Sequence, residues 1–87
     1  FSLVKITLHY LHKSMNKIEV IIKRYKGETF TLEINRSDTA LDLRQQIEKR
    51  TGLPIYNFRL ILDGRQLLKE ELSGYNVQNG TVFNVIG

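Results

Sequence analysis

The chain has 87 residues, which is enough for one small domain with a single hydrophobic core. It contains no cysteine, so disulfides, cysteine-ligated metal sites and thiol nucleophiles are excluded, and the composition is compatible with the cytoplasm or the nucleus. The net charge is +4, part of it from Lys5 and Lys13, and no apolar run approaches the ~20 residues of a membrane span, so neither a dedicated nucleic-acid-binding protein nor a membrane protein is indicated.

Residues 1–14 are predicted to be separate from the domain that follows, residues 15–87. Apolar and polar residues alternate over residues 4–10, which is the period of a β-strand. Two interpretations remain open: a linker or a segment foreign to the natural protein, and an added edge strand or dimerisation arm, without which a monomer is expected. His9 and His12 are weak evidence for metal, because no carboxylate or thiol accompanies them, so no metal or cofactor is expected.

The next stretch, residues 18–34, has the pattern of a β-hairpin. Apolar and polar residues alternate along two runs, so one face of the hairpin is expected to join the core and the other to face water. Residues 25–28 form the turn between the runs, and Gly27 is the residue there that is able to take a positive φ. The inward positions are Ile18, Val20, Ile22, Phe30, Leu32 and Ile34.

A helix is predicted between residues 37 and 54, and both of its ends are marked. Thr39 is the expected N-cap, with Asp42 in the place of the glutamate of a capping box. Gly52 can adopt the left-handed conformation that ends a helix, and Pro54 prevents its continuation. Such a helix is marginal alone and must pack its apolar stripe against the strands. The stripe consists of Ala40, Leu43 and Ile47.

The remainder of the chain is predicted to complete a sheet. After a short connection, residues 58–62 alternate as a third strand, residues 63–64 form a turn, and Leu67 is an inward residue of a short fourth strand. Residues 72–76 indicate a tight helical turn and residues 82–86 a last strand. The predicted fold class is therefore α+β, a mixed four- to five-stranded sheet curled over one helix in the order ββαββ, with a short extra turn before the last strand.

The alternation also predicts which side chains are buried. Almost complete burial is expected for Phe30, Leu32, Ile34, Leu43, Ile47, Phe58, Leu60, Phe83 and Val85. Ile61 follows an inward residue of its strand and is expected to be substantially exposed, as is Ile86 near the end of the last strand. Isolated exposed apolar side chains are common on protein surfaces, so the pattern alone requires no function for Ile61.

Several short motifs resemble the ubiquitin sequence nearly in register. They are T-L-E-I at 31–34, S-D-T at 37–39, G-L-P at 52–54, R-L-I-L-D-G-R-Q-L at 59–67 and L-S-G-Y-N-V-Q at 72–78. The resemblance extends from Ile18 to Ile86, with one apparent deletion near residues 69–71. By these motifs the chain is identified as a member of the ubiquitin-like β-grasp family, in agreement with the order of its elements.

The resemblance implies recognition of proteins, not catalysis. In ubiquitin the principal binding site is an apolar patch on the exposed face of the sheet, and its central isoleucine corresponds to Ile61. Tyr25 stands in place of a leucine of the patch, Asn84 in place of a histidine, and Ile86 is the remaining member. The implied partners are proteins with ubiquitin-binding elements or enzymes of the ubiquitin pathway, with no small-molecule substrate and no membrane. Positive charge around the patch is expected from Lys23, Arg59 and Arg65.

A second exposed site of the family corresponds to Ile21. Val82 is expected beside it on the outward face of the sheet. For this pair, a binding function and a purely structural role both remain open.

Conjugation is another activity that the resemblance raises. The lysines on which ubiquitin chains are most often built correspond to Arg65 and Asn79, whereas Lys23 keeps its amine. Arginine stays protonated and forms no isopeptide bond at neutral pH. The given sequence stops at Gly87 without the Leu-Arg-Gly-Gly tail of conjugated members. The expectation is an unconjugated domain or a modifier whose diglycine tail is missing here, and an activating enzyme is not expected to charge the unextended chain.

Two other classes of function are disfavoured by the residues. An enzyme is not expected, because the chain lacks cysteine, has its histidines in residues 1–14 and disperses its acidic residues, so no nucleophile and base can be paired. Nucleic-acid binding is the lesser alternative, since it needs a basic face on the sheet. The residues that would form this face are Lys23, Arg24, Lys26, Arg59 and Arg65.

Overall fold

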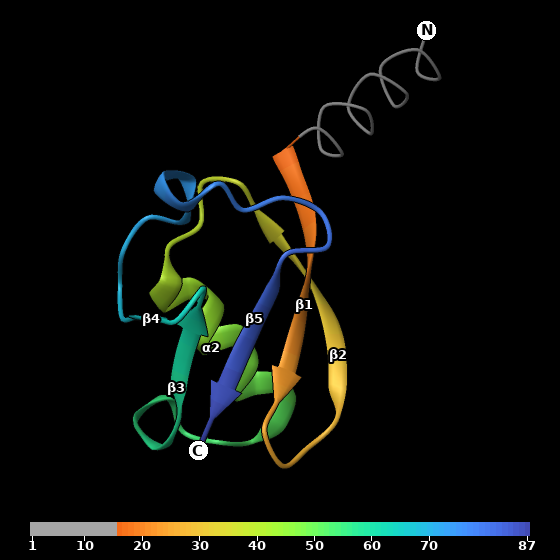
Figure 1. Ribbon diagram of the computed structural model, residues 1–87, viewed down its shortest axis with the longest axis vertical. Helices are drawn as coiled ribbons and strands as arrows, with labels where there is room; N and C mark the ends of the chain where they lie inside the picture. The colour runs from red at the N-terminus through yellow and green to blue at the C-terminus, as the bar shows by residue number, and fades with distance from the viewer. Residues whose placement is uncertain (1–15) are drawn as a thin grey trace, which may run out of the picture.

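The computed structural model describes residues 16–87 (Figure 1). The predicted extra strand in residues 1–14 and the histidine pair lie outside the described residues. The elements are strands β1 (Lys17–Arg24), β2 (Thr29–Asn35), β3 (Arg59–Leu62), β4 (Arg65–Leu67) and β5 (Val82–Ile86), helix α2 (Ala40–Thr51), and the 3₁₀ turns η1 (Ile55–Asn57) and η2 (Leu72–Tyr75). This order confirms the predicted one.

The five strands form one mixed sheet in the order β2-β1-β5-β3-β4. The first and last strands, β1 and β5, are parallel, and every other pair is antiparallel. Figure 1 shows α2 crossing one face of the sheet, with the other face turned toward the viewer and not covered by any described element. The predicted β-grasp architecture is therefore confirmed, and it leaves one sheet face open to solvent. No helix in residues 16–87 has the length and apolarity required to cross a membrane.

Helix α2 begins and ends where the sequence predicts. The Asp42 N–H donates to Thr39 Oγ1 at 3.1 Å, and the Thr39 N–H donates to Asp42 Oδ2 at 2.9 Å, so aspartate completes the capping box. Gly52 has a φ of 79°, and its N–H donates to the Glu48 carbonyl at 2.8 Å. These bonds satisfy backbone groups that the helix ends would otherwise leave unpaired.

The polar flank of α2 fixes two connections that the sequence pattern left undefined. Arg44 donates from Nη1 to the Leu68 carbonyl at 2.9 Å and from Nη2 to the Ile55 carbonyl at 3.1 Å. Glu48 Oε2 accepts the Ile55 N–H at 3.1 Å. The helix therefore holds both η1 and the segment after β4 against itself.

The β1–β2 turn differs from the expectation. Gly27 does not have a positive φ, so the turn does not use the left-handed conformation that this glycine could adopt. The turn is longer than two residues, because the last pair of the hairpin is Lys23 with Thr29, and a left-handed residue is not required to reverse the chain. A Cβ atom on Gly27 would lie 2.9 Å from Nε of Arg24, so the glycine makes room for the Arg24 side chain instead.

The inner face of the sheet and the α2 stripe form one apolar core. Most residues predicted to be buried are buried, but Leu32 is only half-buried, although Phe30 and Ile34 on the same edge strand are buried. Ile61 is half-buried and not substantially exposed, because β3 lies between β4 and β5 and their outward side chains flank it. Leu72 and Val77 join the core from the irregular segment before β5, which has no period to indicate burial.

Glu70 organises the segment after β4, near the deletion relative to ubiquitin. Its Oε1 accepts the Leu68 N–H at 2.6 Å and the Lys69 N–H at 2.8 Å, and its carbonyl accepts the Ala40 N–H at 2.7 Å. These backbone hydrogen bonds to the carboxylate, with a smaller effect of the Arg44 charge, hold the pKa of Glu70 below its ordinary value of 4.5. The ionised carboxylate is therefore the form that the folded chain favours.

Truncation of the α2 stripe should destabilise the whole domain. Leu43 is fully buried between α2 and the sheet, so Leu43→Ala should lower the free energy of unfolding by about 2–5 kcal/mol through lost apolar contacts and a residual cavity. Chemical denaturation should show a lower midpoint for this variant, whereas Gln45→Ala, on the exposed face of the same helix, should stay within about 0.5 kcal/mol of the parent. An unchanged midpoint for Leu43→Ala would contradict this assignment of the helix face.

Acidification should release the Glu70 turn. Because the folded pKa is lowered, the stabilisation is fully present above 4.5 and is lost as the pH falls through the folded pKa. The amide proton shifts of Leu68 and Lys69, followed by NMR, should titrate together with a midpoint below 4.5. Glu70→Gln should remove this titration, and a midpoint at or above 4.5 in the parent chain would show that the carboxylate does not hold the turn.

Candidate protein-binding surface

The strand register brings the predicted patch residues into one row across the open face. Ile61 on β3 pairs with Asn84 on β5, and Asn84 pairs with Lys23 on β1. Gln66 on β4 lies opposite Ile61 and extends the row at its other end. Residues paired across a sheet point to the same face, so these four side chains lie side by side on the face opposite α2.

A second row lies next to the first, toward the carboxyl end of β5. Arg59 pairs with Ile86, and the Tyr25 N–H donates to the Val85 carbonyl at 3.0 Å, which holds Tyr25 beside the end of β5. Ile86 is 47% exposed and Tyr25 is 77% exposed. The expected exposure of Ile86 is confirmed.

A hollow of about 200 Å³ opens where these two rows meet. It is lined by Lys23, Arg24, Tyr25, Asn84, Val85 and Ile86. Four of these were predicted as patch residues from the sequence, whereas Arg24 was predicted only as part of a basic face. The structure thus brings Tyr25, Asn84, Ile86 and Lys23 together around one concavity, with Ile61 beside it in the same row.

Arg65 lies one pair along the β3–β4 ladder from Ile61. Asp63 and Gly64 both have positive φ, 50° and 80°, and this two-residue turn pairs Leu62 with Arg65. Leu62 is buried on the inner side, so Arg65 is out of register with the outward row and Gln66 occupies the position beside Ile61. A two-residue turn at Asp63-Gly64 pairs Leu62 with Arg65, and the next pair is then Ile61 with Gln66. The Asp-Gly turn motif was therefore a sufficient sequence signal for the position of Gln66.

Among the described residues, the surface around the hollow carries positive side chains that are not paired with acidic ones. Within residues 16–87, the exposed side chains of Lys23 and Arg59 form no ion pair, whereas Lys17 farther along β1 pairs with Glu33 at 3.3 Å. No carboxylate lines the hollow. An acidic ligand would therefore meet cations that need not first break another ion pair.

The second predicted patch lies on the same face at the other end of β5. Ile21 pairs with Val82 across the parallel β1–β5 ladder, so the two side chains are adjacent. Val82 is 41% exposed, and Ile21 is half-buried. Asn84 lies between Val82 and Ile86 on the outward side of β5, so the two apolar spots are separated by one polar residue.

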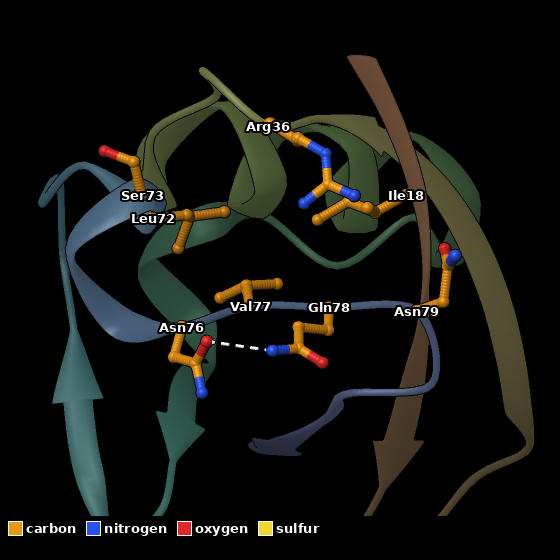
Figure 2. Close-up of a pocket in the computed structure, with 8 residues that line it drawn as sticks. All are labelled: Ile18, Arg36, Leu72, Ser73, Asn76, Val77, Gln78 and Asn79. Carbon is orange, nitrogen blue, oxygen red and sulfur yellow. Dashed lines mark hydrogen bonds between the residues drawn. The ribbon is translucent and has the colours of Figure 1, made fainter. Parts of the chain in front are cut away.

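A further hollow lies elsewhere and contains none of the predicted site residues. Figure 2 shows it under the connection that leads from η2 to β5, with a volume of about 520 Å³. Its amides bond within the chain: Gln78 Nε2 donates to Asn76 Oδ1 at 2.9 Å, and Asn79 Oδ1 accepts the Glu19 N–H at 2.9 Å. Its apolar lining consists of the buried Ile18, Leu72 and Val77. The described residues also contain no group of three or more potential metal ligands.

Comparison with known proteins agrees with the fold. Residues 20–87 match the sequence profile of the ubiquitin family. This match covers most of the chain, and the chain therefore belongs to the ubiquitin family.

The chain is similar to members of different overall length. The ubiquitin-like domain-containing protein CIP73 of Lotus japonicus is 34% identical over 70 residues, which are 79% of this chain and 10% of CIP73. The NEDD8-like protein RUB3 of Arabidopsis thaliana is 26% identical over 70 residues, which are 79% of this chain and 90% of RUB3. Among solved structures, the UBL domain of Plasmodium falciparum Dsk2 has a TM-score of 0.75 and 31% identity, covering 80% of this chain and 96% of that domain.

Proposed function

We propose that this ubiquitin-like domain, residues 15–87, binds proteins that carry ubiquitin-recognition elements, or enzymes of the ubiquitin pathway, through the open sheet face around Ile61. The observation that supports this most directly is the row formed by Ile61, Asn84 and Lys23 beside the hollow at Ile86. The likeness to the Dsk2 UBL domain supports a role as an interaction module. The domain acts by binding and not by catalysis.

The sheet holds the side chains of this face in fixed positions, which favours binding of a partner. The three middle strands of the sheet are paired on both sides, so the backbone of the surface is already ordered before a partner arrives. A partner helix with an apolar stripe can cover Ile61 and Ile86, while Tyr25 offers a large aromatic contact at one edge. Apolar burial then provides most of the affinity, and Lys23 and Arg59 orient the partner.

A conjugated modifier is the second candidate, and the observation that favours it is the coverage of RUB3, of which this chain spans 90%. A modifier in cells forms covalent adducts with other proteins, whereas a binding module does not. An antibody raised against residues 16–87 should detect a single species on a denaturing gel if the domain only binds. A ladder of larger species that resists denaturation would favour the modifier.

Removal of the central isoleucine should weaken binding more than folding. Ile61→Ala should reduce the affinity for a synthetic ubiquitin-interacting helix by about tenfold or more, because a buried interface anchor is lost. Isothermal titration calorimetry measures the affinity, and the ¹H–¹⁵N spectrum checks that the fold persists. Gln45→Ala, on the helix at the far side of the sheet, is the control and should bind as the parent does.

Two outcomes would redirect this proposal. Unchanged affinity for Ile61→Ala with a loss for Val82→Ala would move the binding site to the pair of Ile21 and Val82. A steep fall of affinity for single-stranded oligonucleotides with rising salt, together with no helix binding, would favour the nucleic-acid alternative, because phosphate contacts release counterions and apolar contacts do not.

A further inference from the structure

A second hollow adjoins the patch and has no counterpart among the sequence predictions. It has a volume of about 260 Å³ and meets the first hollow at Ile86, which lines both. Because β5 lies between β1 and β3, the first hollow is on the β1 side of Ile86 and the second is on the β3 side. The second hollow is lined by Tyr56, Asn57, Phe58, Arg59, Ile86 and Gly87.

Tyr56 is the most exposed large hydrophobic residue of the described chain, at 87%. Its neighbours explain why the ring projects outward: Ile55 packs against the core and is held by Arg44 and Glu48, and Phe58 is buried. The backbone is thus fixed on both sides of Tyr56. Within residues 16–87 its hydroxyl has no hydrogen-bond partner. A tyrosine held in this way offers a large contact area at a small cost in conformational entropy.

The two hollows have the same charge. Their linings include Lys23 and Arg24 on one side of Ile86 and Arg59 on the other, and neither lining includes an aspartate or glutamate side chain. The complementary ligand therefore has an apolar centre to cover Ile86 and negative charge on both sides of it.

We propose that the two hollows form one docking site for an acidic amphipathic segment of a partner protein, with Tyr56 as a specificity-determining residue. This inference rests on the function proposed above. An apolar side chain of the segment packs on Ile86, its carboxylates pair with Lys23 and Arg59, and Tyr56 covers the segment at the β3 end. A partner whose segment stops at Ile86 loses the Tyr56 contact, so this ring discriminates between partners that the patch around Ile61 would accept equally.

A protein segment fits this surface better than a nucleic-acid strand. Aromatic and basic side chains also occur in sites for single strands, where successive bases stack on the rings. Here the residue between the two tyrosines is the uncharged Ile86, and in the adjoining row Ile61 and Asn84 also offer no positive charge to a phosphate, although Arg59 pairs with Ile86 on one side. The continuous basic track along a backbone that such binding needs is therefore interrupted at the centre.

The test uses two synthetic amphipathic helical peptides that differ only in charge. One carries glutamates on both flanks of its apolar face, and the other carries glutamines at the same positions. Titration of the ¹⁵N-labelled chain with the acidic peptide should shift the amide signals of Asn57 and Arg59 together with those of Lys23 and Tyr25. Calorimetry on the parent chain and its variants then gives the affinities.

Tyr56→Ala should weaken binding of the acidic peptide about tenfold, and Tyr56→Phe should restore it to within about twofold, because the ring and not the hydroxyl makes the contact. Arg59→Gln should weaken binding of the acidic peptide and leave the glutamine peptide unaffected. Lys49→Gln removes a charge from the exposed side of α2, away from the site, and should change neither affinity.

The outcomes separate this inference from the proposed function. If Ile61→Ala abolishes binding but Tyr56→Ala has no effect, or if signals shift only around the first hollow, the domain binds proteins and the extended site is wrong. If the acidic peptide does not bind the parent chain, or a single-stranded oligonucleotide displaces it from Tyr56, the proposed occupant is wrong. If Ile61→Ala has no effect on a peptide that does bind, the proposed function itself fails.

Discussion

The parallel pairing of β1 with β5 is the constraint on which the rest of the structure depends. Without β5, the chain would consist of two separate hairpins, β1–β2 and β3–β4, each too small to be stable alone. β5 enters between them and brings Phe83 beside Ile22, both fully buried over α2. Because this pairing joins the two ends of the described domain, the core and the outward rows form only when the whole chain has folded. The proposed binding surface is thus a product of tertiary structure, although each of its strands can be predicted from the sequence.

The elements could be predicted from the sequence because each has a strong local signal. Period-two alternation marked the strands, and Thr39 and Gly52 marked the ends of α2. The alternation predicts which face of the sheet a side chain occupies, but it does not predict how completely neighbouring side chains cover it. Leu32 and Ile61 have the same alternating pattern as their neighbours, but Leu32 is less covered than predicted, and Ile61, on a strand paired on both sides, is more covered.

The site was less predictable for a related reason. The resemblance to ubiquitin supplied Ile61, Tyr25, Asn84 and Ile86, and the register brings them together. It also suggested Arg65 as a source of positive charge, and the tight Asp-Gly turn pairs Arg65 with Leu62, so that Gln66 lies opposite Ile61. Tyr56 had no signal at all, since it lies in a three-residue turn whose orientation depends on contacts that α2 makes with residues on either side. Local pattern therefore predicts strands, but the position of a side chain in a short connection depends on distant partners.

The outward apolar residues differ in how much they contribute to the packing of the sheet in addition to their proposed contact with a partner. Ile61 is half-buried, so it supports the sheet as well as offering a contact, whereas Ile86, Tyr25 and Tyr56 can be altered with little loss of core packing. Asn84 lies between the spots at Ile86 and Val82, and its amide must keep a hydrogen bond when it is covered, since an unpaired buried amide costs about 1–3 kcal/mol. A partner that covers both spots must therefore supply a polar group opposite Asn84. A partner with a purely apolar stripe is confined to one spot, and the positive charge around Ile86 directs an acidic one to that end of β5.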